Sequence, residues 1–92
     1  MIYTVELSSL TKKQLKKLPI HTVVSFQNWV EDVETRGLEE VRKTPGYHDE
    51  PLRGELKGLR SVRLSRAYRA YYRVVGTALQ FVSVERIDKH EY

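Results

Sequence analysis

Basic and aromatic side chains in the second half of this chain could together act on a phosphodiester of RNA. Cleavage through the 2′-hydroxyl needs a group that takes its proton, a group that protonates the leaving 5′-oxygen, and cations that stabilise the phosphoryl charge. His90 is the residue most able to exchange a proton near neutral pH, and Tyr92 could stack or donate a proton. Arginine suits the cationic role because its planar guanidinium binds phosphate in a bidentate manner and keeps its proton. The candidates are Arg63, Arg69 and Arg86, with Tyr71 between them as a residue that could stack on an unpaired base.

Each of these residues also has a purely structural interpretation. A histidine near a chain end, such as His90, is more often a surface or capping residue than a proton donor. Glu50 precedes Pro51 and could simply close a turn or pair with Arg53. Both interpretations stay open when the residues are considered alone.

The basic residues are concentrated in the second half of the chain. The whole chain has 16 Lys/Arg and 12 Asp/Glu, a net charge of +4. Residues 1–50 hold seven Lys/Arg and eight Asp/Glu, whereas residues 51–92 hold nine and four, and seven of those nine are arginine. A local excess of arginine indicates a polyanion partner, although a solvated sheet face would carry the same charges.

Length and composition predict a single soluble domain spanning residues 1–92. A chain this short buries only about two-thirds of its unfolded surface, which is too little for two cores. No apolar run approaches the roughly 20 residues of a membrane span, the N-terminus lacks signal-peptide features, and there is no cysteine. We therefore expect a cytoplasmic protein with no membrane partner. His21 and His48 have no metal-ligand spacing, so we expect neither a metal nor a cofactor.

The apolar pattern predicts an α+β fold with the order β-α-α-β-β-β. A main helix is expected at about residues 20–36, because Gly37 suits a C-cap and apolar residues recur at helical spacing at Val23, Phe26, Val30 and Val33. Turn residues make the segment from Gly37 to Gly58 a structured loop. The other expected elements are a strand at 2–7, a short helix ending near Lys17, and strands at 59–65, 67–75 and 78–86. We expect an antiparallel sheet with two helices packed on one face and the other face partly open.

Side-chain alternation predicts which groups occupy the open face. In the strand at 67–75, Arg69, Tyr71 and Arg73 share one side. A tight turn before this strand would place Arg63 directly beside Arg69. Adjacent arginines repel one another, so this pair indicates an anion site, unless a carboxylate such as Glu85 pairs with them.

Two motifs carry a resemblance to a known family. Pro-Leu-Arg-Gly-x-x-x-Gly occupies residues 51–58, and Tyr-Arg-x-x-Tyr occupies residues 68–72. Lys-Lys-Leu-Pro at 16–19 and the closing His-Glu-Tyr at 90–92 extend the pattern over nearly the whole chain. With the expected order of elements, the chain resembles the RelE/ParE toxin superfamily, and within it the YoeB- and HigB-like ribonucleases.

The resemblance implies a toxin of a toxin–antitoxin operon that enters the ribosomal A site and cuts mRNA there without a metal. By position it implies that Glu50 is the general base and that Arg69 stabilises the phosphate. It implies that His90 is the general acid and that Tyr92 stacks or assists, although Glu91 stands between them where YoeB-like chains end in His-Tyr. The residues expected to bind RNA are Arg53, Arg63, Tyr71, Arg73 and Arg86.

The resemblance also implies partners. We expect the ribosome, mRNA and a cognate antitoxin that covers the arginine face, and either a homodimer or a toxin–antitoxin hetero-oligomer. Two alternative functions remain open. One is a ParE-like toxin that inhibits DNA gyrase without nuclease activity, and the other is a non-catalytic basic RNA-binding domain.

Overall fold

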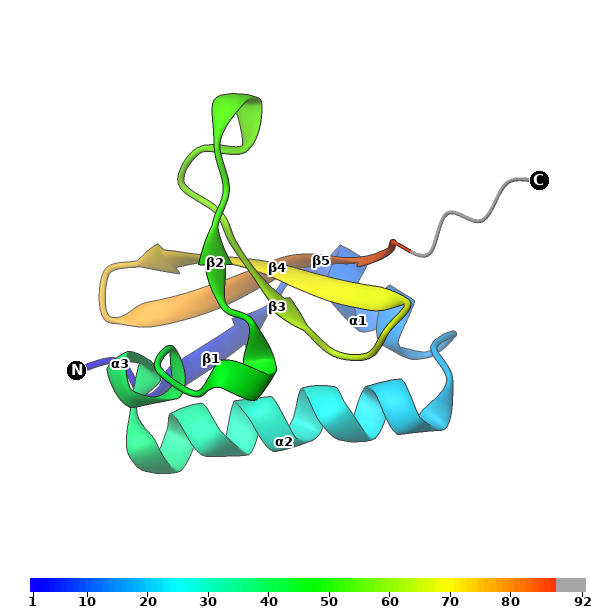
Figure 1. Cartoon of the computed structure of the whole chain (residues 1–92), viewed down its shortest axis with the longest axis horizontal. Helices are drawn as coiled ribbons and strands as arrows, with labels where there is room; N and C mark the ends of the chain where they lie inside the picture. The colour runs from blue at the N-terminus through cyan, green and yellow to red at the C-terminus, as the bar shows by residue number, and fades with distance from the viewer. Residues whose placement is uncertain (88–92) are drawn as a thin grey trace.

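The computed structural model describes residues 1–87 and confirms the α+β fold class (Figure 1). The strands are β1 (Thr4–Leu7), β2 (Glu50–Pro51), β3 (Arg60–Arg63), β4 (Tyr68–Val75) and β5 (Ala78–Arg86). The α-helices are α1 (Ser9–Leu15), α2 (Ile20–Arg36) and α3 (Leu38–Val41), and two 3-10 turns are η1 (Pro45–Tyr47) and η2 (Gly54–Leu56). The main helix, α2, has the predicted bounds. It ends at Gly37, whose φ of 88° favours glycine.

The five strands form one sheet in the order β1-β5-β4-β3-β2. The strands β3, β4 and β5 pair antiparallel through short turns, as predicted. β1, however, runs parallel to β5, so the sheet is mixed and not wholly antiparallel as expected. The physical reason is the connection. Short turns force neighbouring strands to reverse, whereas the helical crossover that follows β1 allows the parallel direction.

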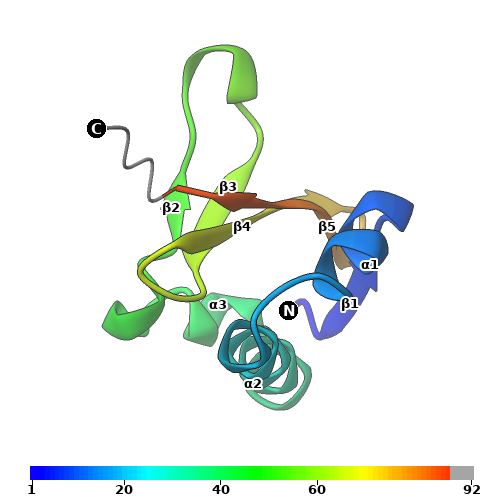
Figure 2. The ribbon, with the colours of Figure 1, turned by 90° about the vertical axis from the view of Figure 1, so that its right-hand side faces the viewer.

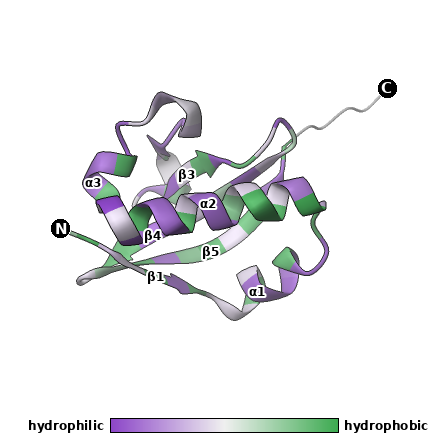
Figure 3. Cartoon of the chain, turned by 90° about the horizontal axis from the view of Figure 1, so that it is seen from below, coloured by the Kyte–Doolittle hydropathy of each residue, from purple (hydrophilic) through white to green (hydrophobic). Residues whose placement is uncertain are grey.

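The hydrophobic core lies between α2 and one face of the sheet (Figure 3). Trp29 of α2 is fully buried and meets Phe81 and Tyr72, with ring centroids 5.2 and 5.3 Å away. Phe26, one turn earlier, lies 4.7 Å from Phe81. These contacts fix which side of β4 and β5 faces the helix. The alternate residues of both strands are therefore turned to the opposite side, which we call the open face.

The register shifts once, between β4 and β5. Tyr71 pairs with Ser83, whereas Tyr72 pairs with Phe81, so Val82 is an extra residue in β5. This bulge keeps Phe81 in the core while Ser83 stays level with Tyr71 on the open face. Helix α1 lies beside this part of β5, where the side-chain oxygen of Gln14 accepts a hydrogen bond of 2.6 Å from the backbone N–H of Val84.

The segment predicted as a structured loop contains α3, η1, the short strand β2 and η2. β2 pairs antiparallel with β3, Glu50 opposite Ser61 and Pro51 opposite Arg60. The pairing continues into a hairpin, because Leu52 N donates to Leu59 O at 2.9 Å. The tip of this hairpin, which contains η2, stands out from the sheet on the side away from α2 (Figure 2).

Candidate functional site

Two rows of side chains cross the open face. Residues that pair directly in an antiparallel sheet project on the same side. The first row contains one residue from each of β2, β3, β4 and β5: Glu50, Ser61, Tyr71 and Ser83. The next row contains Arg63, Arg69 and Glu85. The register therefore brings Glu50 within one row of the arginine pair, and it confirms the predicted pairing of Arg63 with Arg69.

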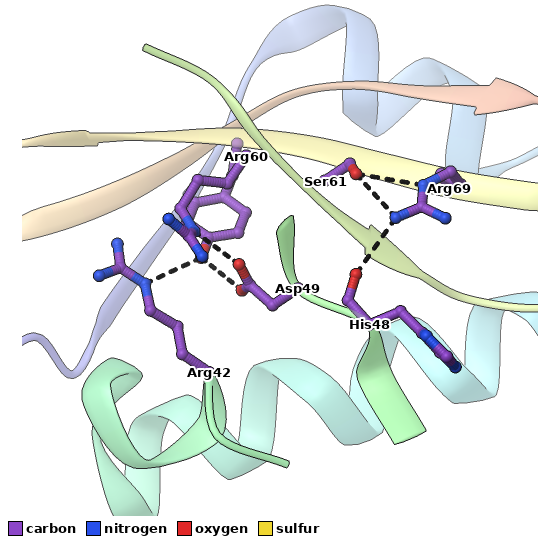
Figure 4. Close-up of polar contacts among 7 residues, drawn as sticks. Arg42, His48, Asp49, Arg60, Ser61 and Arg69 are labelled. Atoms are coloured by element: carbon purple, nitrogen blue, oxygen red, sulfur yellow. Dashed lines mark hydrogen bonds and ion pairs between the residues drawn. The ribbon is translucent and has the colours of Figure 1, made fainter. Parts of the chain in front are cut away.

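Arg69 is held in place on this face (Figure 4). Its Nε and Nη2 donate to Ser61 Oγ at 3.1 and 2.8 Å, and Nη2 also donates to His48 O at 3.2 Å. Glu85 lies opposite Arg69 in the register, yet within residues 1–87 the hydrogen bonds of Arg69 go to Ser61 and His48. A guanidinium has five N–H donors, and within residues 1–87 the hydrogen bonds of Arg69 use only its Nε and Nη2.

A buried polar cluster lies on the opposite side of the same strands. The carboxylate of Asp49 is fully buried and accepts hydrogen bonds of 2.6 Å from Arg60 Nε and from Tyr72 Oη. Arg42, which follows α3, donates to Tyr72 Oη at 3.5 Å. Because Asp49 immediately precedes Glu50, this cluster fixes the backbone from which Glu50 projects.

Residues 48–50 each make a different contact. The carbonyl of His48 holds Arg69, the side chain of Asp49 anchors the segment in the interior, and Glu50 enters the sheet opposite Ser61. His48 adopts a left-handed conformation, with φ 49° and ψ 50°, which turns the chain from η1 into β2. The backbone here is specified by tertiary contacts on both faces of the sheet.

Burial and charge shift the protonation of this cluster. Burial raises the pKa of Tyr72, the bond from Arg42 opposes that rise, and the bond to Asp49 reinforces it. For Arg60, burial alone would lower the pKa, but the hydrogen bond and charge of Asp49 raise it overall. Both shifts favour a neutral tyrosine and a charged arginine, which is the state that donates to Asp49.

The open face is hollowed beside the two rows. A pocket of about 280 Å³ lies between the hairpin tip and the sheet. Its lining residues come from the hairpin, from β4 and from the end of β5: Leu56, Leu59, Tyr71, Ser83, Glu85, Arg86 and Ile87. Ile87 is the last residue described, so the described part of the chain ends at the rim of this pocket.

The other predicted site residues are distributed as follows. Arg53 is exposed and directly precedes η2 at the hairpin tip. Arg73 is exposed on β4 and is bound to Gln80, whose Oε1 accepts from its Nε and Nη2 at 3.1 and 3.0 Å. Arg86 borders the pocket. In the strand register it lies opposite Tyr68, so strand alternation does not place it in the row of Arg63 and Arg69. His90 and Tyr92 lie outside the described residues.

Sequence reasoning missed the residues that support the site. Ser61 lies within an expected strand and carries no motif of its own, and no sequence pattern points to Asp49, Arg60 or Arg42. A signal for Ser61 did exist, since the predicted alternation of β3 turns it to the same side as Arg63. No local pattern identifies Asp49, because its burial depends on how β2 pairs with β3.

In residues 1–87 there is no cluster of three or more His, Cys, Asp or Glu side chains that could hold a metal ion. Among the same residues, no helix is both long and apolar enough to cross a membrane.

The fold is similar to those of solved toxin–antitoxin proteins. A chain of the toxin–antitoxin complex RelBE2 from Mycobacterium tuberculosis is 26% identical, with a TM-score of 0.69 over 95% of this chain and 100% of that chain. A chain of the RelE–RelB complex from Pyrococcus horikoshii is 22% identical, with a TM-score of 0.70 over 98% and 100%. A chain of the YoeB–YefM complex from Staphylococcus aureus is 16% identical, with a TM-score of 0.71 over the full length of both.

The chain has the fold of the RelE/YoeB-like toxin superfamily. No protein-family model matches it, and no curated protein sequence matches it either. The arrangement of elements carries the relationship, and it confirms the resemblance that the sequence motifs suggested. In this RelE/YoeB-like chain, β2, β3 and β4 place Glu50, Arg63 and Arg69 in neighbouring rows of the open face.

Proposed function

We propose that the protein is a ribosome-dependent endoribonuclease toxin that cuts mRNA in the ribosomal A site. The observation that carries the proposal is the pairing of β2, β3 and β4, which sets Glu50 one row from Arg63 and Arg69 on a face that α2 leaves uncovered. Similarity to chains of toxin–antitoxin complexes supports the toxin role.

The proposed chemistry is a transesterification within the RNA. Glu50 takes the proton of the 2′-hydroxyl, O2′ bonds to the phosphorus, and the bond to the 5′-oxygen breaks. The products are a 2′,3′-cyclic phosphate and a 5′-hydroxyl, with the last proton supplied by a general acid. No step needs a metal, because arginine and not a divalent cation holds the phosphoryl charge.

Arg69 is suited to bind the charge that develops on the phosphate. Its orientation is fixed by Ser61 and His48 before substrate arrives, so little reorganisation is needed in the transition state. Arg63 lies next to it and is exposed. Two guanidinium groups on one side of a phosphate can hold several oxygens at once.

His90 remains the proposed general acid, with Tyr92 as the residue that stacks or assists. His90 follows Ile87 by three residues, which span at most about 10 Å. Ile87 lines the pocket beside Tyr71 and Glu85. The chain length therefore permits His90 to reach the open face from the rim.

The proposed partners are the ribosome, mRNA and a cognate antitoxin. The similar solved structures include a RelE–RelB complex and a YoeB–YefM complex. An antitoxin of this protein would neutralise it by covering the open face, either in one-to-one complexes or in larger hetero-oligomers.

Cleavage of mRNA on purified, programmed ribosomes tests the proposal. Wild type should cut within the A-site codon, and Arg69→Ala and Glu50→Gln should each lower the rate about a hundredfold or more, as deletion of transition-state contacts does. The matched control is Arg36→Ala on α2, which removes an arginine from a partly exposed pair with Asp32 on the helix side. Folding of every variant is checked by circular dichroism.

The outcomes separate the candidate functions. Full cleavage by folded Arg69→Ala would remove its role, and full cleavage by Glu50→Gln would leave Glu50 as a turn residue. Absence of cleavage by wild type, with DNA damage preceding the translation block in cells, would favour a ParE-like gyrase inhibitor. Ribosome binding without cleavage would favour a non-catalytic RNA-binding domain.

A further inference from the structure

The pocket beside the arginine pair has the size and walls of a site for one flat ring system. Its volume of about 280 Å³ lies just below the range of roughly 300–1,000 Å³ that is usual for small-ligand pockets. Leu56 and Leu59 of the hairpin form one side, and the half-buried ring of Tyr71 forms part of the sheet side. Apolar and aromatic walls of this kind hold an unpaired base by stacking.

Glu85 gives this pocket a specific polar group. It lines the pocket, it is exposed, and none of the hydrogen bonds or ion pairs within residues 1–87 uses its carboxylate. An ionised carboxylate only accepts hydrogen bonds. A base that presents adjacent donors on its edge would therefore satisfy both carboxylate oxygens.

Among the four RNA bases, guanine alone offers two adjacent donors, N1–H and the N2 amino group, on its Watson–Crick edge. Adenine and cytosine place an amino group next to an acceptor, and the N3–H of uracil lies between two carbonyl oxygens that a carboxylate repels. Ser83 is two residues before Glu85 on the same face and also lines the pocket. Its hydroxyl can donate to guanine O6, the remaining group on that edge.

We propose that this pocket binds a guanine base of the RNA substrate, with Glu85 as the residue that selects it. The inference deepens the proposed ribonuclease function and rests on it for the identity of the ligand. Because Glu85 pairs with Arg69 across the sheet, a base in the pocket belongs to a nucleotide next to the phosphate held by Arg69. The pocket thus sets sequence preference, whereas the arginines bind any phosphate.

Nucleotide binding to the isolated full-length chain tests the pocket without requiring cleavage. The four ribonucleoside 3′-monophosphates are titrated separately, and the amide signals of Ser83 and Glu85 are followed by NMR. Guanosine 3′-monophosphate should bind about tenfold to a hundredfold more tightly than the other three, as bidentate recognition of one base edge predicts. Glu85→Gln, which keeps the shape but replaces one acceptor with a donor, should abolish that preference.

A matched variant isolates the effect of the pocket carboxylate. Glu55→Gln removes an exposed carboxylate from η2, outside the lining of the pocket, and should keep the preference for guanine. Equal binding of all four nucleotides, no binding of any, or a guanine preference that survives in Glu85→Gln would each overturn the inference. If the protein prefers guanine but cuts no RNA, the proposed ribonuclease function is refuted and the guanine pocket is supported. If the protein cuts RNA but shows no preference for guanine, the guanine pocket is refuted and the ribonuclease function is supported.

Discussion

Removing the buried carboxylate of Asp49 should destabilise the fold far more than removing a similar carboxylate at the surface. Asp49 is fully buried and accepts two hydrogen bonds of 2.6 Å, from Arg60 and Tyr72. Asp49→Ala leaves the partly buried guanidinium of Arg60 without its partner. Asp49→Asn keeps the shape and one acceptor oxygen but removes the charge.

The magnitude follows from the lost interactions. Breaking a buried ion pair by removing one partner costs about 3–5 kcal/mol. Two hydrogen bonds that involve charged groups, at about 1.5–3 kcal/mol each, give a similar figure. We expect Asp49→Ala to lower the free energy of unfolding by this amount and Asp49→Asn by roughly half of it. The free energy of unfolding of a small domain is only about 5–15 kcal/mol, so we expect the variants to fold but to be markedly less stable than wild type.

Urea unfolding measures the effect, and Asp32 supplies the matched control. Asp32 also accepts a 2.6 Å hydrogen bond from a tyrosine, Tyr47, and pairs with an arginine, Arg36, at 3.4 Å, but its side chain is 33% exposed. Asp32→Asn should cost only about 1 kcal/mol, because solvent weakens the pair. Equal losses for Asp49→Asn and Asp32→Asn would refute the reasoning from burial.

Three further predictions follow from the same structure. Ser61→Ala should lower the cleavage rate about tenfold while the chain stays folded, because Arg69 loses the oxygen that orients its Nε and Nη2. A cleavage rate equal to that of wild type on programmed ribosomes would contradict this prediction. Burial, followed by the hydrogen bond and charge of Asp32, raises the pKa of Tyr47 to about 12. The hydroxyl of Tyr47 therefore stabilises the fold fully below about pH 10, and this stabilisation is lost between about pH 10 and 12. The difference in free energy of unfolding between wild type and Tyr47→Phe, measured in urea, should narrow over that pH range. A chain ending at Lys89 should fold and bind ribosomes but fail to cleave, and full cleavage by it would show that His90 and Tyr92 are not needed.

Much of the fold could be predicted because it depends on local patterns. The apolar spacing and Gly37 gave the bounds of α2, and the tight turn before β4 set Arg63 opposite Arg69. Strand alternation then predicted that Tyr71 shares their side of the sheet. These features need only neighbours in sequence, so periodicity is sufficient to find them.

The rest of the site depends on contacts between distant segments. The residues before Pro51 read as a turn, and nothing local shows that Asp49 is buried against Arg60 while Glu50 pairs with Ser61. The parallel direction of β1 is likewise set by the helical crossover and not by a turn. The pairing register of β2 with β3 decides where Asp49 and Glu50 lie, and a single sequence does not specify it.

The proposed cleavage depends most directly on the 2′-hydroxyl as the attacking group. The decisive measurement uses ribosomes programmed with two mRNAs that differ only in one 2′-deoxynucleotide, placed at the nucleotide 5′ of the cleaved phosphate. We predict that wild-type protein cuts the all-ribose message to give a 2′,3′-cyclic phosphate and a 5′-hydroxyl, and that the 2′-deoxy message is not cut at that site. Cleavage of both messages at the same rate, or products with a 5′-phosphate, would contradict the roles assigned to Glu50 and Arg69.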